Sequence, residues 1–417
     1  MKIIERYRSW SLILRIVVGL VIGAVLGLLF PHATAIGMLG SVFVGALKGF
    51  APFLVLVLVV SSIAQGNSKL DGRFRFVIFE YLLSTFLAAM IAVTASYIFR
   101  VTIKLTTEAE AESIPSGIGE VLNKLLLSVV SNPVDSIASG NYIGVLFWAV
   151  LFGLAIKKIA SDSTKKVLAD IADSSSIIIR WIIELAPFGV LGLVYSSVST
   201  SGLTIFVDYG RLILLLVGCM AFMALVITPL MVFVILRRNP YPLVLKCLKE
   251  SAITAFFTRS SAANIPVNMR LCERLGLDKD LYSVSIPLGS TINMDGAAIT
   301  ITVMTLATAW TMGINVDIGS AIVLSILSTV AACGASGVAG GSLLLIPMAC
   351  SLFGIPTDVA MQVVGVGFVI GVVQDSVETA LNSSGDVVFA ATAEYRYWKK
   401  NGKSLPTFLG GTTKLDI

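Results

Sequence analysis

The stretch that decides the fold is Asp375-Ser376-Val377-Glu378-Thr379-Ala380-Leu381-Asn382-Ser383-Ser384-Gly385-Asp386, which follows 16 residues without a charged side chain. Four polar side chains in it are spaced 4, 3 and 4 residues apart, so a helix would carry them on one face: Asp375, Thr379, Asn382 and Asp386. A carboxylate among apolar residues must face the protein interior, a water cavity, a cation or a counter-charge. The alternative is that some of these groups, Asp386 above all, lie near a helix end and touch water.

The composition of the whole chain places this stretch in a membrane protein. Of 417 residues, 56% are hydrophobic and only 13% are charged, and the mean hydropathy is +0.92. These values argue against a soluble enzyme, a disordered chain or a nucleic-acid binder. The five cysteines are scattered without a CxxC motif and there is a single histidine, so we expect neither a disulfide framework nor a zinc site.

Apolar runs long enough to cross a bilayer recur along the chain, which predicts a polytopic, all-α membrane protein. The runs free of Asp, Glu, Lys and Arg include 16–47, 49–68, 81–99, 136–156, 186–207, 212–236, 296–316 and 318–357. Lys and Arg alternate between successive loops, which predicts a cytoplasmic N-terminus, six spans before residue 237 and a cytoplasmic C-terminus. A cleaved signal peptide is a less favoured interpretation of the first run, because many further spans follow.

The second half is expected to contain two helical hairpins. Residues 241–280 carry several charges, and their middle, 259–266, is small, polar and ends in Pro266. Two half-length helices meeting at this tip fit better than a crossing, and such a re-entrant tip must be buried in protein or line a cavity. The run 318–357 has a Gly-rich centre at 334–342, and it is either two short spans or a second hairpin that enters from the opposite face.

Each hairpin is followed by a long helix with polar content, which indicates an inverted repeat with a site at the midplane. In the first of these helices, Asn293 and Asp295 are two residues apart and are flanked by Gly289 and Gly296. This spacing predicts a locally unwound segment whose carbonyls and carboxylates suit Na⁺ or another hard cation. A polar helix–helix contact is the plainer alternative. Gly-Ser tips would favour a carboxylate ligand and Asp375 an ammonium, so together they would bind a zwitterion.

Enzymatic interpretations fit poorly. Gly334-Ala335-Ser336-Gly337 matches the GxSG string of intramembrane serine proteases, but the only histidine, His32, is expected at the extracellular end of the first span. An aspartyl protease using Asp295 and Asp375 would leave Asn293 and both Ser-rich tips unexplained. No Walker A sequence occurs, so an ATP-driven pump is not expected from this chain alone. A channel built from broken helices remains a further alternative.

These motifs resemble the dicarboxylate/amino acid:cation symporter family along nearly the whole chain. The motifs are Arg259-Ser260-Ser261, Asn293-Met294-Asp295-Gly296, the Gly-rich second tip and Asp375…Asn382…Asp386. Within the family the chain is most similar to bacterial sodium/serine–threonine symporters. The resemblance implies eight transmembrane helices, two re-entrant hairpins and a homotrimer in the lipid of the cell (inner) membrane, with no nucleic-acid partner. It also implies an elevator-type mechanism, in which a transport domain slides past a scaffold.

The resemblance also implies how the chain divides. The implied segments are scaffold spans 1 and 2 at 12–68, transport-domain span 3 at 76–100, scaffold spans 4 and 5 at 136–204, transport-domain span 6 at 206–236, hairpin 1 at 241–275, span 7 at 281–312, hairpin 2 at 318–356 and span 8 at 358–393.

Three Na⁺ sites are implied by the same resemblance. The first uses carbonyls of Gly289, Asn293 and Asn382 with the carboxylate of Asp386. The second uses carbonyls of Thr291 and of residues near Ala332, Cys333 and Ala335. The third joins Asn293 and Asp295 to Tyr81, Ser84 and Thr85.

The implied substrate site lies beside them. The α-carboxylate would meet Ser261 and Asn382, and the ammonium would meet Asp375. Gly337 and Val338 would close the second hairpin as an outer gate. The other residues expected at this site are Ser260, Met294, Glu378 and Thr379.

Departures from the family pattern indicate the substrate. Acidic-substrate members carry an arginine where this chain has Glu378, and an ionised glutamate would repel an acidic side chain. A neutral substrate such as serine or threonine fits, because its hydroxyl could bond to Glu378 or Thr379. Ala297 replaces a threonine of aspartate transporters, and Ala339 replaces a proline of the second tip. The alternative functions are a proton-coupled symporter or one with broader neutral and acidic specificity.

Arg259 carries a further hypothesis. Its side chain could reach Glu378 or Asp375 across the site and keep the empty pocket neutral.

Overall fold

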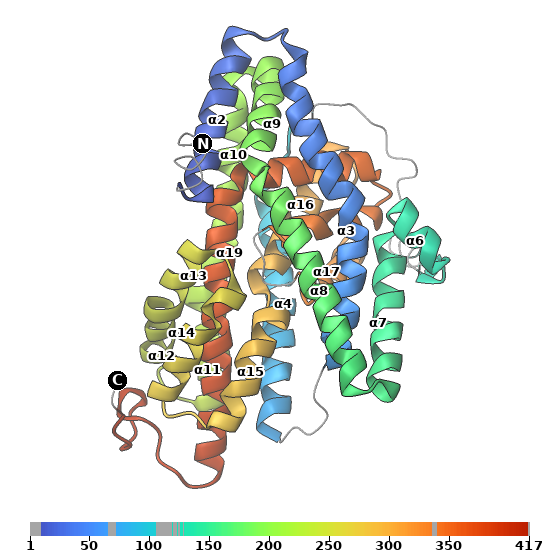
Figure 1. The fold of residues 1–417 in the computed structure, drawn as a ribbon. Coiled ribbons are helices and arrows are strands. Elements are labelled where there is room, and N and C mark those ends of the chain that lie inside the picture. Colours follow the sequence, from blue (N-terminus) through green and yellow to red (C-terminus); the bar gives the residue numbers. More distant parts are fainter. Residues whose placement is uncertain are drawn as a thin grey trace.

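The structure is a computed structural model that describes residues 10–65, 72–105, 129–335 and 340–415, together with 119, 123, 126 and 127. In these residues every regular element is a helix (Figure 1), which confirms the all-α prediction. The first half contains α2 (Leu12–Leu29), α3 (Gly37–Gln65), α4 (Gly72–Ile98), α6 (Pro133–Ser139), α7 (Tyr142–Ile159), α8 (Asp162–Glu184) and α9 (Ala186–Ser201). The second half contains α10 (Ile205–Phe222), α11 (Thr228–Leu236), α12 (Tyr241–Cys247), α13 (Ile253–Thr258), α14 (Ser261–Arg274), α15 (Lys279–Ile292), α16 (Asp295–Thr311), α17 (Ile318–Ala332), α18 (Ile346–Ser351) and α19 (Thr357–Lys400).

Short turns complete these elements. Single π-helical turns, Met223–Ile227 and Leu248–Ala252, join α10 to α11 and α12 to α13. The 3₁₀ turns are Thr34–Ile36, Gly202–Thr204, Ser342–Leu345 and Thr407–Leu409.

Six described helical stretches are long and apolar enough to cross a membrane: Thr34–Gln65, Gly72–Ile98, Tyr142–Ile159, Gly202–Leu236, Lys279–Thr311 and Thr357–Lys400. A seventh candidate is the pair α8 and α9, which is bent by 49° at its junction. The apolar parts of α2 and α17 are shorter. The structure is therefore that of a multi-pass membrane protein, and the count of eight crossings with two re-entrant hairpins stays a prediction.

Helix packing forms two groups. In one group α3 lies against α7, α8 and α9, while α2 pairs with α9. In the other, α19 packs against α4, the helices from α10 to α16, and α18, while α17 packs against α4 and α16. Figure 1 shows α19 running down the length of this second group. A hydrophobic core joins both groups, and a smaller one surrounds the C-terminal half of α19 with α11, α12 and α15.

Two helix boundaries differ from the apolar runs, since backbone geometry overrides composition. The run 136–156 is broken between α6 and α7, where Gly140 has a left-handed φ of +71° and the side chain of Asn141 caps the next helix. Within the run 186–207, helix α9 ends at Ser201, because the next residue, Gly202, has a left-handed φ of +64°. In addition, α19 is longer than the predicted 358–393: its 44 residues extend about 66 Å at 1.5 Å per residue.

Residues 241–275 form two helical arms, and whether they make a re-entrant hairpin stays a prediction. The first arm is α12 with its π turn and α13, and the second is α14. The arms meet at Arg259, whose φ of +51° is unusual for a non-glycine residue, and Ser260 caps α14 by accepting a hydrogen bond from the backbone of Ala263. The sharp turn places the guanidinium of Arg259 near α19.

Candidate functional site

The site is built where the chain between α15 and α16 crosses α19. The helix is interrupted at Asn293 and Met294, as the spacing of Asn293 and Asp295 predicts. The amide of Asn293 donates to the backbone oxygen of Asn382 at 3.1 Å and to Oδ1 of Asp386 at 3.0 Å. The backbone N–H of Gly296 donates to Oδ1 of Asn382 at 2.7 Å. The break in the helix therefore leaves polar groups of Asn293 and Gly296 free to donate hydrogen bonds to Asn382 and Asp386 of α19.

Glycines make this crossing possible. A Cβ on Gly289 would lie 2.6 Å from Oδ1 of Asp386 and 2.8 Å from the hydroxyl of Tyr81. A Cβ on Gly296 would lie 2.8 Å from Cα of Glu378, and one on Gly385 would lie 2.8 Å from Nδ2 of Asn293. Such distances are too short for real contacts, so these positions need glycine for close approach.

Helix α4 supplies hydroxyl groups to the same region. Ser84 Oγ lies 2.6 Å from Oδ2 of Asp295, and Thr85 Oγ1 lies 3.2 Å from Oδ1. The hydroxyl of Tyr81 lies 3.2 Å from the backbone oxygen of Asp386. Ser84 and Thr85 thus lie beside Asp295, with which the resemblance groups them. Tyr81 instead contacts Asp386, which the resemblance assigns to a different Na⁺ site.

The electrostatics of this cluster are unbalanced. Asp295 and Asp386 are at most 1% exposed, and among the described residues no lysine or arginine lies within ion-pair distance of either. Oδ1 of Asn293 and Oδ2 of Asp386 are buried acceptors without a donor in the described part of the chain. Unmatched buried acceptors and charges are costly. A hard cation bound by these oxygens would satisfy both. Burial of Asp386 also excludes the alternative of a helix end in water.

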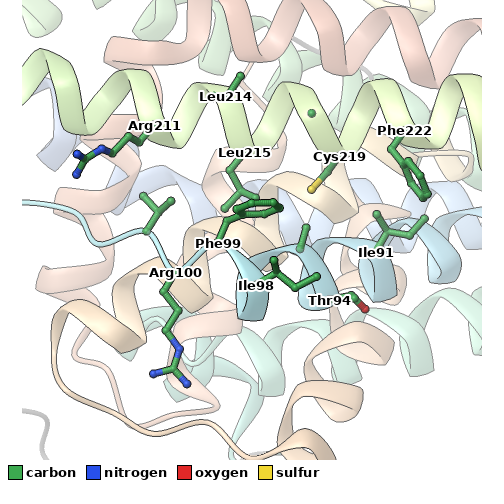
Figure 2. Close-up of a pocket in the computed structure, with 13 residues that line it drawn as sticks. Ile91, Thr94, Ile98, Phe99, Arg100, Arg211, Leu214, Leu215, Cys219 and Phe222 are labelled. Carbon is green, nitrogen blue, oxygen red and sulfur yellow. The ribbon is translucent and has the colours of Figure 1, made fainter.

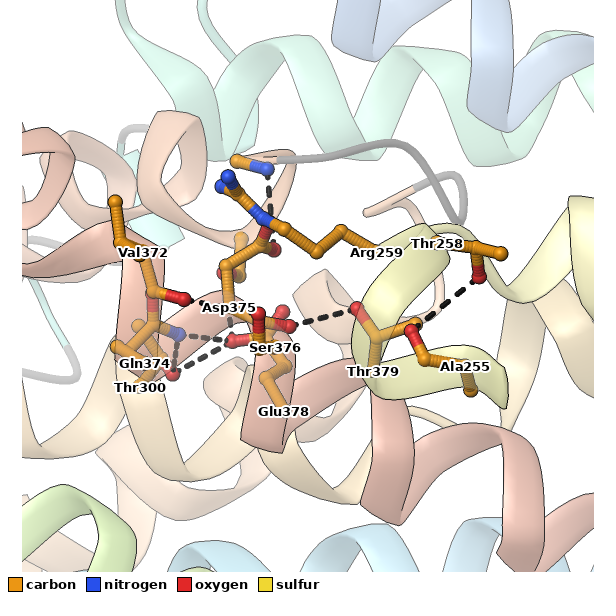
Figure 3. Close-up of polar contacts among 12 residues, drawn as sticks. Ala255, Thr258, Arg259, Thr300, Val372, Gln374, Asp375, Ser376, Glu378 and Thr379 are labelled. Carbon is orange, nitrogen blue, oxygen red and sulfur yellow. Dashed lines mark hydrogen bonds and ion pairs between the residues drawn. The ribbon is translucent and has the colours of Figure 1, made fainter. Parts of the chain in front are cut away.

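The guanidinium of Arg259 meets α19 on the other side of the site (Figure 3). Its Nε lies 2.7 Å from Oδ2 of Asp375, with the two side chains 11% and 3% exposed. The backbone N–H of Gly340 donates to Oδ1 of the same carboxylate at 3.2 Å. Of the two partners considered for Arg259, the structure therefore selects Asp375. This carboxylate links the turn between α13 and α14 to the chain just before the 3₁₀ turn Ser342–Leu345.

Glu378 is held by polar groups that the sequence argument did not single out. Its Oε2 lies 2.7 Å from the hydroxyl of Thr300 and 2.9 Å from that of Ser342, and it accepts from the amide of Gln374. Figure 3 shows Gln374 and Thr300 beside Glu378. Gln374 immediately precedes Asp375 in an apolar stretch, which was the available signal. Thr300 follows Gly296 by one helical turn, but its partner is visible only in three dimensions.

A second cluster that the sequence did not predict joins α14 and the π turn Leu248–Ala252 to α19. The amides of Asn264 and Asn268 donate to Oγ and O of Ser383 at 2.8 and 3.0 Å. The hydroxyl of Ser251, on the other arm, donates to Asn268 at 2.6 Å. The spacing of four between Asn264 and Asn268 was a signal for one shared helix face.

The remaining expected site residues make the following contacts, and their expected roles stay predictions. The hydroxyls of Thr291 and Thr379 bond to backbone oxygens of Leu288 and Asp375 in their own helices. Ser260 is the cap of α14, Ser261 is buried, and the sulfur of Met294 accepts from Asn382. Cys333 and Ala335 follow the end of α17, and the thiol of Cys333 is 3.6 Å from the backbone oxygen of Ile292. Gly337, Val338 and Ala339 lie outside the described residues.

Apolar helices around a buried polar crossing, with broken elements that meet there, define a class of secondary membrane transporters. The chain belongs to the sodium:dicarboxylate symporter family, whose model matches residues 12–395. This membership makes it a transporter rather than an enzyme.

Individual relatives are similar over almost their full length. A serine/threonine transporter SstT of Bifidobacterium adolescentis is 62% identical over 403 residues, which cover 97% of this chain and 94% of the relative. One from Streptococcus thermophilus is 56% identical and covers 96% and 100%, respectively. One from Streptococcus agalactiae is 57% identical and covers 94% and 98%.

Proposed function

We propose that this chain is a Na⁺-coupled symporter that imports serine and threonine across the cytoplasmic membrane by an elevator-type alternating-access mechanism. The observation that carries Na⁺ coupling is the pair of buried carboxylates, Asp295 and Asp386, together with two buried acceptors, Asn293 Oδ1 and Asp386 Oδ2, that have no donor among the described residues. Family membership and the names of the relatives support the transport of a small amino acid.

The roles of the substrate-site residues follow from their charges. In this proposal the substrate ammonium replaces the guanidinium of Arg259 at Asp375, so one cation exchanges for another and the buried carboxylate is never left unpaired. Ser261 and Asn382 receive the substrate carboxylate. The second hairpin, including Gly337 and Val338, closes over the ligand as the outer gate.

Selectivity rests on Glu378. An acidic substrate would bring a second carboxylate close to Glu378 in a region of low dielectric, where like charges repel strongly. The side chain of serine or threonine brings a neutral hydroxyl instead. We assign it to the space beside Glu378 and Thr379.

The proposal extends to assembly and orientation. The chain would form a homotrimer with both termini in the cytoplasm. Its transport domain would contain α4 and the helices from α10 to α19, which include both predicted hairpins.

A proton-coupled symporter is the second candidate, favoured by one observation. Among the described residues, Glu378 has hydroxyl and amide partners but no basic partner within ion-pair distance, so it could carry a proton.

Uptake of labelled serine into proteoliposomes at fixed pH separates the two candidates. The purified protein faces external Na⁺ or choline. Na⁺-dependent accumulation that threonine inhibits and aspartate does not is the expected result. Equal uptake in Na⁺ and in choline, if it is abolished when the proton gradient is collapsed, would show that H⁺ and not Na⁺ is the coupling ion. Inhibition by aspartate would overturn the assignment of selectivity to Glu378.

A further inference from the structure

A groove of about 770 Å³ lies on the surface between α4 and α10, away from the polar site. Both helices belong to stretches that are long and apolar enough to cross a membrane. One wall runs from Ile91 to Val101 and the other from Arg211 to Phe222. Gly218 contributes to its floor, and a Cβ built there would meet nothing within 4 Å. The groove therefore stays open because this position of α10 has no side chain.

One end of the groove is positively charged and the other end is apolar. Figure 2 shows Arg100 and Arg211 toward one end and Ile91 and Phe222 toward the other. The groove-lining residues include no acidic side chain. Apart from the arginines, the polar lining groups are the thiol of Cys219 and the hydroxyl of Thr94, which donates to the backbone of its own helix.

The two arginines keep charge available for a ligand. The guanidinium of Arg100 lies 5.7 Å from the ring of Trp310, and no carboxylate of the described residues is within ion-pair distance of it. Arg211 is 71% exposed, and its nearest carboxylate, Asp208, is 4.0 Å away. That carboxylate is shared with Lys104, whose Nζ lies 3.7 Å from it. The positive end of the groove is thus only partly neutralised.

The length of the groove matches one leaflet of a bilayer. One wall covers 11 residues, of which the first eight are helical, and the other covers 12 helical residues, so the longer wall extends about 17 Å at 1.5 Å per helical residue. The hydrocarbon core of a bilayer is about 30 Å thick. If the arginines lie at the headgroup level, the apolar walls reach the bilayer midplane.

We propose that this groove binds one anionic phospholipid. Its phosphate contacts Arg100 and Arg211, and an acyl chain lies along the apolar walls over Gly218. Net negative charge distinguishes this ligand from a zwitterionic phospholipid, whose ammonium would offset the phosphate beside two guanidinium groups. A small amino acid would leave most of the apolar wall without a partner, so the groove is distinct from the substrate site.

Native mass spectrometry of the full-length protein tests the proposal without reference to transport. The protein is released from detergent micelles doped with phosphatidylglycerol or, separately, phosphatidylcholine of the same acyl chains. Retention of phosphatidylglycerol over phosphatidylcholine is expected. Each of Arg100→Gln and Arg211→Gln should lower phosphatidylglycerol retention about fivefold. Gly218→Leu should lower retention of both lipids by filling the groove.

Gly210→Leu is the matched control, because Gly210 lies on the same helix, also faces open space and does not line the groove. It should retain phosphatidylglycerol as the unmodified protein does. Equal retention of both lipids, or unchanged retention in Gly218→Leu, would overturn the proposal. Displacement of the lipid by millimolar inorganic phosphate would show that the arginines bind a free anion and that the groove is not a lipid site. Size-exclusion profiles of the variants establish that each is folded.

Discussion

Nε of Arg259 lies 2.7 Å from Oδ2 of Asp375, although the two residues are 116 positions apart. The contact joins the turn between α13 and α14 to the centre of α19 and neutralises a buried carboxylate. A substrate ammonium at Asp375 must displace this guanidinium, so the protein contains a cation that competes with its proposed ligand.

Replacing Arg259 tests this competition. Asparagine tolerates the positive φ of this residue but carries no charge, so Arg259→Asn should lower the Kd of serine about tenfold. Arg259→Lys keeps a competing cation and serves as the control, with a Kd near that of the unmodified protein. Isothermal titration calorimetry in saturating Na⁺ measures both. An unchanged Kd and unchanged pH dependence of binding in Arg259→Asn would refute the idea.

The proposed Na⁺ site predicts a selective effect at Asp386. Asp386→Asn removes the charge but keeps the shape, so the Na⁺ concentration for half-maximal serine uptake should rise about tenfold or more. Asp173→Asn, at an exposed position of α8, is the control and should behave as the unmodified protein. If both variants have the same Na⁺ dependence, Asp386 does not bind the coupling ion.

Helix propensity and close packing predict opposite effects of replacing Gly289 with alanine. Alanine would favour the helix by about 1 kcal/mol relative to glycine. Its Cβ would nevertheless lie 2.6 Å from Oδ1 of Asp386 and 2.8 Å from the hydroxyl of Tyr81. Gly289→Ala should therefore lose most Na⁺-dependent uptake while the protein remains folded. Gly371→Ala, where a Cβ meets nothing within 4 Å, should retain uptake. Equal uptake by both variants would contradict the crossing geometry.

The charge of Glu378 should exclude acidic substrates. Glu378→Gln removes the repulsion, so aspartate should inhibit serine uptake at a concentration about tenfold lower. Ser342→Ala removes one hydrogen-bond partner of Glu378 but keeps its charge, and it should still exclude aspartate. If Glu378→Gln excludes aspartate as before, Glu378 is not a charged selectivity group and the proton-carrier alternative gains support.

Local sequence signals predicted the elements of the site better than their partners. The break at Asn293 and Met294 follows from two polar residues flanked by glycines, because such a segment resists regular helix. The tip at Arg259 and Ser260 follows from small polar residues between charged helical arms. Both features are properties of a few adjacent residues, and both are present in the structure.

Contacts between distant segments could not be predicted in the same way. The sequence left Asp375 and Glu378 as alternative partners of Arg259, because both lie on α19 within one turn. The hydroxyl of Thr300 was overlooked, since its role depends on how α16 packs against Glu378. The left-handed Gly140 also broke an apolar run that composition alone presents as continuous.

Reciprocal coupling is the most direct test of the central claim. If Na⁺ and serine move together, a serine gradient must drive Na⁺ as surely as a Na⁺ gradient drives serine. Proteoliposomes with equal labelled Na⁺ inside and outside would receive an inward serine gradient with the membrane potential clamped at zero. The account predicts transient accumulation of labelled Na⁺ inside, absent when aspartate replaces serine. Serine equilibration without movement of Na⁺ would contradict it.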